Sequence, residues 1–137
     1  MGSTTVTFAN VEGTEAAMGW AGSHTVVADR PAGKDGGMGL GFNGGQLLAL
    51  SIGACFCNDL RSIAHERGVA LHRISVSVTL DFDGMPARVT GGRMVADLAT
   101  DRPEDSDMLL AHAREITTIG NSVQQGFPMV IEAGEGG

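Results

Sequence analysis

Residues 43–68 read NGGQLLALSIGACFCNDLRSIAHERG, and this stretch decides how the chain folds. Asparagine, at position 43, is a residue type that caps helix N-termini, and glycine, at position 68, is one that ends helices. Between them one apolar stripe recurs at helical spacing: Ile52, Phe56, Leu60 and Ile63. The stretch therefore predicts a single long helix.

The first half of this helix has no polar face. From Leu47 to Cys57, apolar or small residues surround the helix axis, a pattern typical of a helix buried on all sides. A chain of 137 residues has little material with which to enclose a helix so completely. Burial by a second subunit is one natural solution, and we expect a homodimer.

Short strands and a long loop are predicted before the helix. Residues 4–8 and 24–28 are rich in β-branched side chains, and the segment between them has room for strand and turn. Residues 29–45 hold seven glycines and one proline, which predicts a long loop.

A hairpin, a helix and a strand are predicted after it. Residues 74–82 alternate apolar and polar side chains, as a half-buried strand does, and residues 88–100 return as its partner with a candidate bulge at 91–92. A second helix lies within 101–120, with Leu109, Ala113 and Ile116 in register. Residues 120–126 form a turn or short helix, and 128–133 a last strand. This order indicates an α+β fold, with helices on a largely antiparallel sheet, in a single domain over 1–137.

Composition excludes several classes of function. Nine basic against sixteen acidic residues give a net charge of −7, the wrong sign for a nucleic-acid-binding surface. No apolar run approaches the roughly 18–20 residues that span a bilayer, and no leader pattern opens the chain. Two cysteines this close together do not make a disulfide framework. We expect a cytoplasmic protein with no membrane and no nucleic-acid partner.

Cys55 and Cys57 are the chemically distinctive residues. They diverge by about 200° around a helix, which disfavours a shared metal ion or a mutual disulfide, and the four histidines show no HxxxH spacing. No metal and no cofactor are predicted. Two interpretations remain open, a small apolar core residue or a nucleophilic thiolate. Asp59, four residues after Cys55, would oppose a thiolate there, whereas Arg61, four after Cys57, would favour one.

The order of motifs resembles the OsmC/Ohr family, the osmotically inducible and organic hydroperoxide resistance proteins. The motifs are W-x-G, an acid before x-P, a glycine-rich run, and a helix that carries G-A-C-F. The residues that carry the resemblance are Trp20, Gly22, Asp29, Pro31, Gly36, Gly37, Asn43, Leu47 and Ala54-Cys55-Phe56. The resemblance covers nearly the whole chain and implies an OsmC-like fold in an intertwined homodimer.

The resemblance also implies a reaction, the thiol-dependent reduction of organic hydroperoxides. Cys55 matches the reacting cysteine, and Arg30 is the best candidate for the arginine that activates it. Gly45 stands where the family has the glutamate that holds this arginine. Residues 121–123, Asn-Ser-Val, stand where it has the resolving cysteine. Cys57 lies outside the family pattern and is a candidate accessory thiol.

Two hypotheses of different classes follow. In the first, the chain is a peroxidase of oxidative stress defence, in which Cys55 attacks the hydroperoxide and an external thiol reduces the product. In the second, it is a non-catalytic OsmC-like dimer that binds a small apolar ligand at the subunit interface. Retention of Cys55 favours the first hypothesis, and the loss of the glutamate and of the resolving cysteine favours the second.

Overall fold

The computed structural model describes residues 2–136 and divides them into two compact units, the first ending at Ala49 and the second beginning at Leu50. The single domain over 1–137 stays a prediction, and its first and last residues lie outside the described chain. The fold is α+β with antiparallel sheets and a long helix, as predicted.

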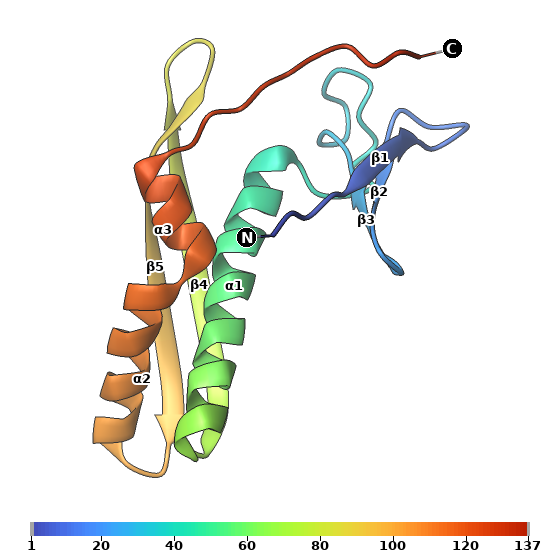
Figure 1. Ribbon diagram of the computed structural model, residues 1–137. Coiled ribbons are helices and arrows are strands. Elements are labelled where there is room, and N and C mark those ends of the chain that lie inside the picture. Colours follow the sequence, from blue (N-terminus) through green and yellow to red (C-terminus); the bar gives the residue numbers. More distant parts are fainter. Residues whose placement is uncertain (1, 137) are drawn as a thin grey trace. The chain divides into compact units, whose positions relative to one another are not determined.

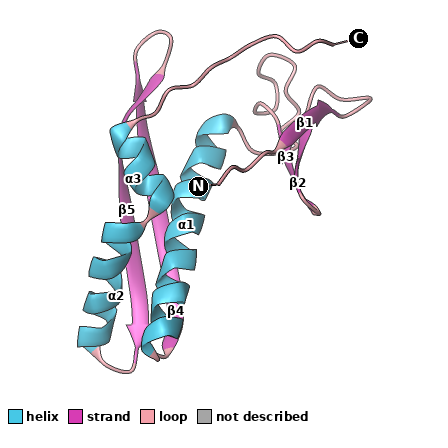
Figure 2. Cartoon of the chain, in the orientation of Figure 1, coloured by secondary structure: helices cyan, strands magenta, loops and turns pink. Residues whose placement is uncertain are grey.

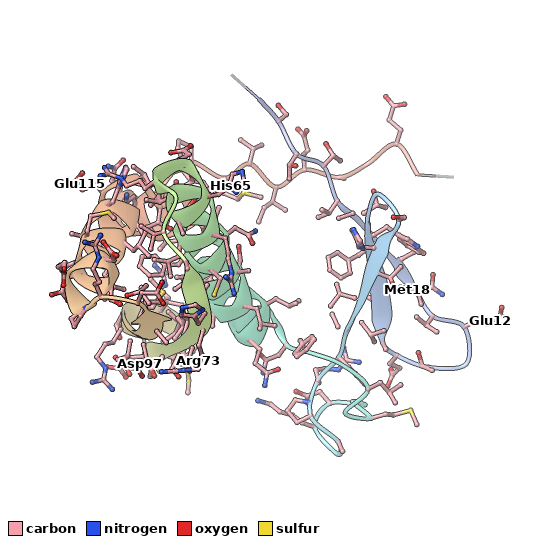
Figure 3. The ribbon with its side chains drawn as sticks, turned by 90° about the horizontal axis from the view of Figure 1, so that it is seen from below. Glu12, Met18, His65, Arg73, Asp97 and Glu115 are labelled. Atoms are coloured by element: carbon pink, nitrogen blue, oxygen red, sulfur yellow. The ribbon has the colours of Figure 1, made fainter. Side chains whose placement is uncertain are left out.

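The first unit contains a three-stranded antiparallel sheet in the order β1-β2-β3. β1 covers Thr7–Asn10, β2 Ala17–Ala21 and β3 His24–Ala28, so the first strand begins later than the predicted 4–8 and the third has the predicted bounds. Glu12 lies in the loop between β1 and β2 (Figure 3). Gly22 takes φ +61° in the tight turn before β3, a left-handed conformation that glycine adopts without steric cost.

Helix α1 spans Gly44–Arg67 and has the predicted ends. The Asn43 side chain accepts a hydrogen bond from the backbone N–H of Gln46 at 2.8 Å, and the Gln46 side chain accepts one from the backbone N–H of Asn43 at 2.9 Å. This reciprocal capping box satisfies two donors that a helix start otherwise leaves unbonded. Gly68 follows the last turn with φ +65°, as a C-terminal glycine does.

The second unit packs two helices on a long hairpin. β4 (Leu71–Asp83) pairs antiparallel with β5 (Arg88–Thr100), and α2 (Pro103–Ile116) and α3 (Thr118–Gln125) follow. α1 and α2 run along the same face of the hairpin (Figures 1 and 2). Their facing side chains and the start of β4 form one core: Phe56, Leu60, Ile63, Ala64, Leu71, Leu109 and Ala113. Arg73 and Asp97 lie on the sheet face away from the helices (Figure 3).

Three sequence predictions about side-chain placement were wrong in detail. The bulge lies at Thr90, opposite the step from Asp81 to Phe82, rather than at 91–92. Phe82 is 53% exposed rather than half-buried like Leu80, since it lies one residue before the end of β4, beside the hairpin turn. Ile116 is 46% exposed, since α2 ends there and the chain turns into α3 before the core reaches it.

Residues 128–133 are not a strand. They follow α3 with no ladder to any described strand, and Val130 and Ile131 are 77% and 91% exposed. A strand requires backbone hydrogen bonds to a neighbour, and neither β4 nor β5 supplies them here.

The all-round burial predicted for residues 47–57 is not reached within one chain. Of these residues only Ile52 and Phe56 are buried, and Leu50 is 50% exposed. By length and composition alone, α1 could also cross a membrane, but a core helix of a globular protein has the same features, so the observation is weak evidence.

Candidate functional site

The Cys55 sulfur lies between two polar side chains of the second unit. The Cys55 thiol donates to Asp59 Oδ2 at 3.7 Å, and the Thr117 hydroxyl donates to Cys55 Sγ at 3.8 Å. Cys55 is partly exposed, so a small molecule can reach it, whereas Thr117 is only 5% exposed. A nucleophile and an acceptor for its proton on α1 therefore meet a donor to the sulfur that comes from another segment of the chain.

Backbone hydrogen bonds at the corner between α2 and α3 position Thr117. Its N–H donates to the carbonyl of Ala113 at 2.9 Å, and its carbonyl accepts from the N–H of Asn121 at 3.2 Å. The hydroxyl makes no cap bond to α3, although Thr117 precedes the first residue of that helix. The Thr117 hydroxyl is therefore free to donate to the Cys55 sulfur. Sequence reasoning missed Thr117, because 62 positions separate it from Cys55 and no local pattern links them.

Cys57 does not gain the neighbour that its spacing suggested. The Arg61 guanidinium donates to the backbone carbonyl of Leu71 at 2.6 Å, so it is engaged at the start of β4. Both thiols are free. Gly53, one turn before Cys57, faces β4, since a Cβ there would lie 3.2 Å from the Val78 side chain. Cys57 accordingly belongs to the sheet-facing side of α1, away from the Thr117 side.

Arg30 lies in the first unit, in the glycine-rich loop after β3. Its guanidinium donates to the backbone carbonyl of Glu15 at 2.7 Å and lies 3.4 Å from the Asp29 carboxylate. Its Nε atom is buried with no hydrogen-bond partner among the described residues. The structure therefore leaves the buried Nε donor of Arg30 unused.

Asp29 organises the loop that carries Arg30. Its side chain accepts the backbone N–H groups of Leu40, Met38 and Arg30, at 3.0, 3.1 and 2.8 Å. The bond from Leu40 is the largest cause that holds the pKa of Asp29 below its ordinary value, and burial acts against it. One carboxylate thus ties together a loop with few apolar residues to stabilise it.

The residues that depart from the family pattern lie within helices α1 and α3 in this chain. Gly45 lies in the first turn of α1, inside the capping box of Asn43 and Gln46. The Asn121 side chain donates to the carbonyl of Glu115 at 3.1 Å, which satisfies an acceptor at the end of α2, and Ser122 donates to the carbonyl of Thr118 at 2.6 Å. Among residues 2–136, no three potential ligands gather to hold a metal ion.

Comparison with known proteins gives a family and a fold. The sequence model of one family, described as OsmC-like protein, matches residues 34–132. No curated protein matches the chain. An OsmC-like protein from Mycoplasma pneumoniae is similar in structure, with a TM-score of 0.74, 12% identity, and coverage of 90% of this chain and 88% of that one.

Two further solved structures carry functional names. An organic hydroperoxide resistance protein OsmC from Legionella pneumophila has a TM-score of 0.66 and 20% identity, and covers 90% of each chain. A hydroperoxide resistance protein from Vibrio cholerae, with captopril bound in one of its active sites, has a TM-score of 0.59 and 23% identity, and covers 90% of this chain and 85% of that one. At these identities the likeness is one of fold.

Proposed function

This chain belongs to the OsmC-like protein family, and on that premise we propose that it reduces organic hydroperoxides through the Cys55 thiol, as part of oxidative stress defence. The observation that carries the proposal is the placement of Cys55: a partly exposed thiol, inside the family match, with polar groups on two sides of its sulfur. The names of the similar proteins from Legionella pneumophila and Vibrio cholerae support the same substrate class.

The proposed reaction has two stages. The Cys55 sulfur attacks the hydroperoxide, the O–O bond breaks, and a sulfenic acid and an alcohol form. An external thiol then condenses with the sulfenic acid, which releases water and leaves a mixed disulfide. A second external thiol frees Cys55. The external reductant is part of the proposal because residues 121 and 122 carry no sulfur and Cys57 points off another side of α1. A reducing, cytoplasmic setting would supply it.

Arg30 is proposed to stabilise the thiolate, and a homodimer to complete the site. The unused Nε donor of Arg30 supports the first idea. Support for the dimer comes from apolar side chains that one chain leaves in water, among them Leu50 and, in the first unit, Trp20 and Phe42. A large exposed apolar surface is typical of an interface.

A non-catalytic dimer that binds a small apolar ligand is the second candidate. Gly45 and residues 121–122 favour it, because they replace the family's acid and its resolving thiol. An open hollow in the first unit, lined by β3 and residues 39–42, offers apolar surface from Leu40 and Phe42.

Oxidation followed by mass spectrometry separates the two candidates. Brief treatment with cumene hydroperoxide should add one oxygen to Cys55, trappable as a sulfenic acid and reversible by an added thiol. The product should persist in Cys57→Ser and be absent in Cys55→Ser. A rapid loss of two hydrogens within the peptide 55–57 would contradict the one-cysteine reaction. No modification of the wild type would favour the ligand-binding dimer.

A further inference from the structure

Among residues 2–136, Asp59 is the one carboxylate in hydrogen-bond contact with the Cys55 sulfur. It follows Cys55 by one helical turn, and its Oδ2 accepts the thiol proton at 3.7 Å. None of the ion pairs formed within residues 2–136 involves Asp59, so no cation there competes for this carboxylate. It is partly buried, which limits the water that would otherwise solvate it.

The two neighbours of the sulfur differ in what they can do. An ionised carboxylate can only accept hydrogen bonds, so Asp59 can take up a proton but cannot stabilise a negative sulfur. The Thr117 hydroxyl can donate, and its bond to sulfur strengthens as negative charge develops there. A nucleophile in contact with a base on one side and a donor on another is the arrangement of an activated nucleophile.

We propose that Asp59 is a catalytic acid–base residue for the Cys55 reaction, an inference that rests on the proposed function. As the sulfur attacks the terminal oxygen of the hydroperoxide, the thiol proton passes to Asp59 Oδ2. The S–O bond forms and the O–O bond breaks, and the departing alkoxide takes the proton from Asp59. One thiol and one hydroperoxide give one sulfenic acid and one alcohol, and Asp59 ends ionised as it began.

The leaving group makes this proton transfer matter. An alkoxide is a strong base and departs slowly unless it is protonated as the O–O bond breaks. Thr117 stabilises the sulfur while the proton is on Asp59, and its burial keeps that hydroxyl from turning to water. Asp59 thus acts on the proton and Thr117 on the sulfur.

A simpler role for Asp59 predicts the opposite result. A carboxylate beside a thiol also repels the thiolate, so Asp59→Asn would then raise the reactivity of Cys55 toward every electrophile. Iodoacetamide and cumene hydroperoxide distinguish the two roles. Both reactions lose the thiol proton, which water or buffer also takes up at equilibrium, but only the departing alkoxide must gain a proton and iodide does not, so only the hydroperoxide reaction needs the acid.

The experiment measures both second-order rate constants at pH 7 in a Cys57→Ser background, where Cys55 is the single thiol. Asp59→Asn should slow oxidation by at least about tenfold, since a positioned acid or base contributes roughly 10²–10⁴-fold. Alkylation should stay within about threefold of the parent or rise, by the repulsion argument above. Asp97→Asn, on the sheet face away from the helices, is the matched control and should change neither.

Two results would overturn the assignment. Equal oxidation rates for the parent and Asp59→Asn would contradict the assignment of Asp59 as the acid–base residue. An oxidation rate that rises together with the alkylation rate in Asp59→Asn would contradict it as well. If the parent alkylates but resists the hydroperoxide, the proposed function itself fails, and the Asp59 step falls with it.

Thr117 supplies a second test that does not depend on Asp59→Asn folding well. Thr117→Val keeps the shape of the side chain and removes the donor, so it should slow oxidation and alkylation alike, by roughly three- to tenfold, the worth of one hydrogen bond. Thr117→Ser should restore both rates. An effect of Thr117→Val on oxidation alone would contradict the division of roles between Thr117 and Asp59.

Discussion

Replacing Leu50 by alanine tests whether a second copy of the chain covers helix α1. Leu50 is 50% exposed in the single chain, although it lies in the apolar half of the helix. Full burial of a leucine side chain stabilises by about 1.5–3 kcal/mol, so covering the exposed half contributes about 0.8–1.5 kcal/mol per chain. A symmetric dimer contains the residue twice, which doubles the figure to about 1.5–3 kcal/mol.

That free energy converts to a roughly 10- to 150-fold weaker dimer for Leu50→Ala, at about 1.4 kcal/mol per tenfold change in Kd. Sedimentation equilibrium across micromolar concentrations measures the dissociation constant directly. Glu66→Ala, exposed near the end of the same helix, is the control and should leave the constant unchanged. A wild-type chain that stays monomeric, or an unaltered dissociation constant for Leu50→Ala, would refute the inference that a partner buries this side chain.

Three further substitutions test the fold. Leu60→Ala should lower the free energy of unfolding by about 2–5 kcal/mol, because Leu60 on α1 is fully buried in the core that α1 shares with α2. Urea denaturation measures this loss, and a loss below about 1 kcal/mol would contradict the tight packing of this core. Asn43→Ala should cost about 0.5–2 kcal/mol in the same assay through loss of the capping box, and no loss would show that the cap is dispensable. Asp29 has a lowered pKa when folded, so its stabilising contribution is present above its ordinary value of 3.8 and is lost as the pH falls below it. Asp29→Asn should therefore be less stable than wild type at pH 7 and lose less stability on acidification to pH 3, and parallel losses would contradict this role.

Patterns that repeat over short stretches predicted the elements well. Helix α1 has the ends that Asn43 and Gly68 indicate, because caps act within one turn of the residue that supplies them. The alternation of β4 holds as far as Leu80, where a half-buried strand requires it. The predictions failed where burial or pairing depends on a segment outside the local pattern. Phe82 lies beside the hairpin turn and is 53% exposed, and residues 128–133 pair with none of the described strands.

The candidate site divides in the same way. The family resemblance could be predicted from the order of motifs along the chain, whereas the helix that carries Cys55 and the neighbour one turn away, Asp59, follow from local helical spacing. Packing between distant segments places Thr117 against the sulfur from the corner of α2 and α3, and turns Arg61 to the carbonyl of Leu71. Helical spacing fixes which residues share a face, but a side chain bonds to whatever acceptor the packed core brings within reach. That choice depends on contacts between segments that no short stretch of sequence contains.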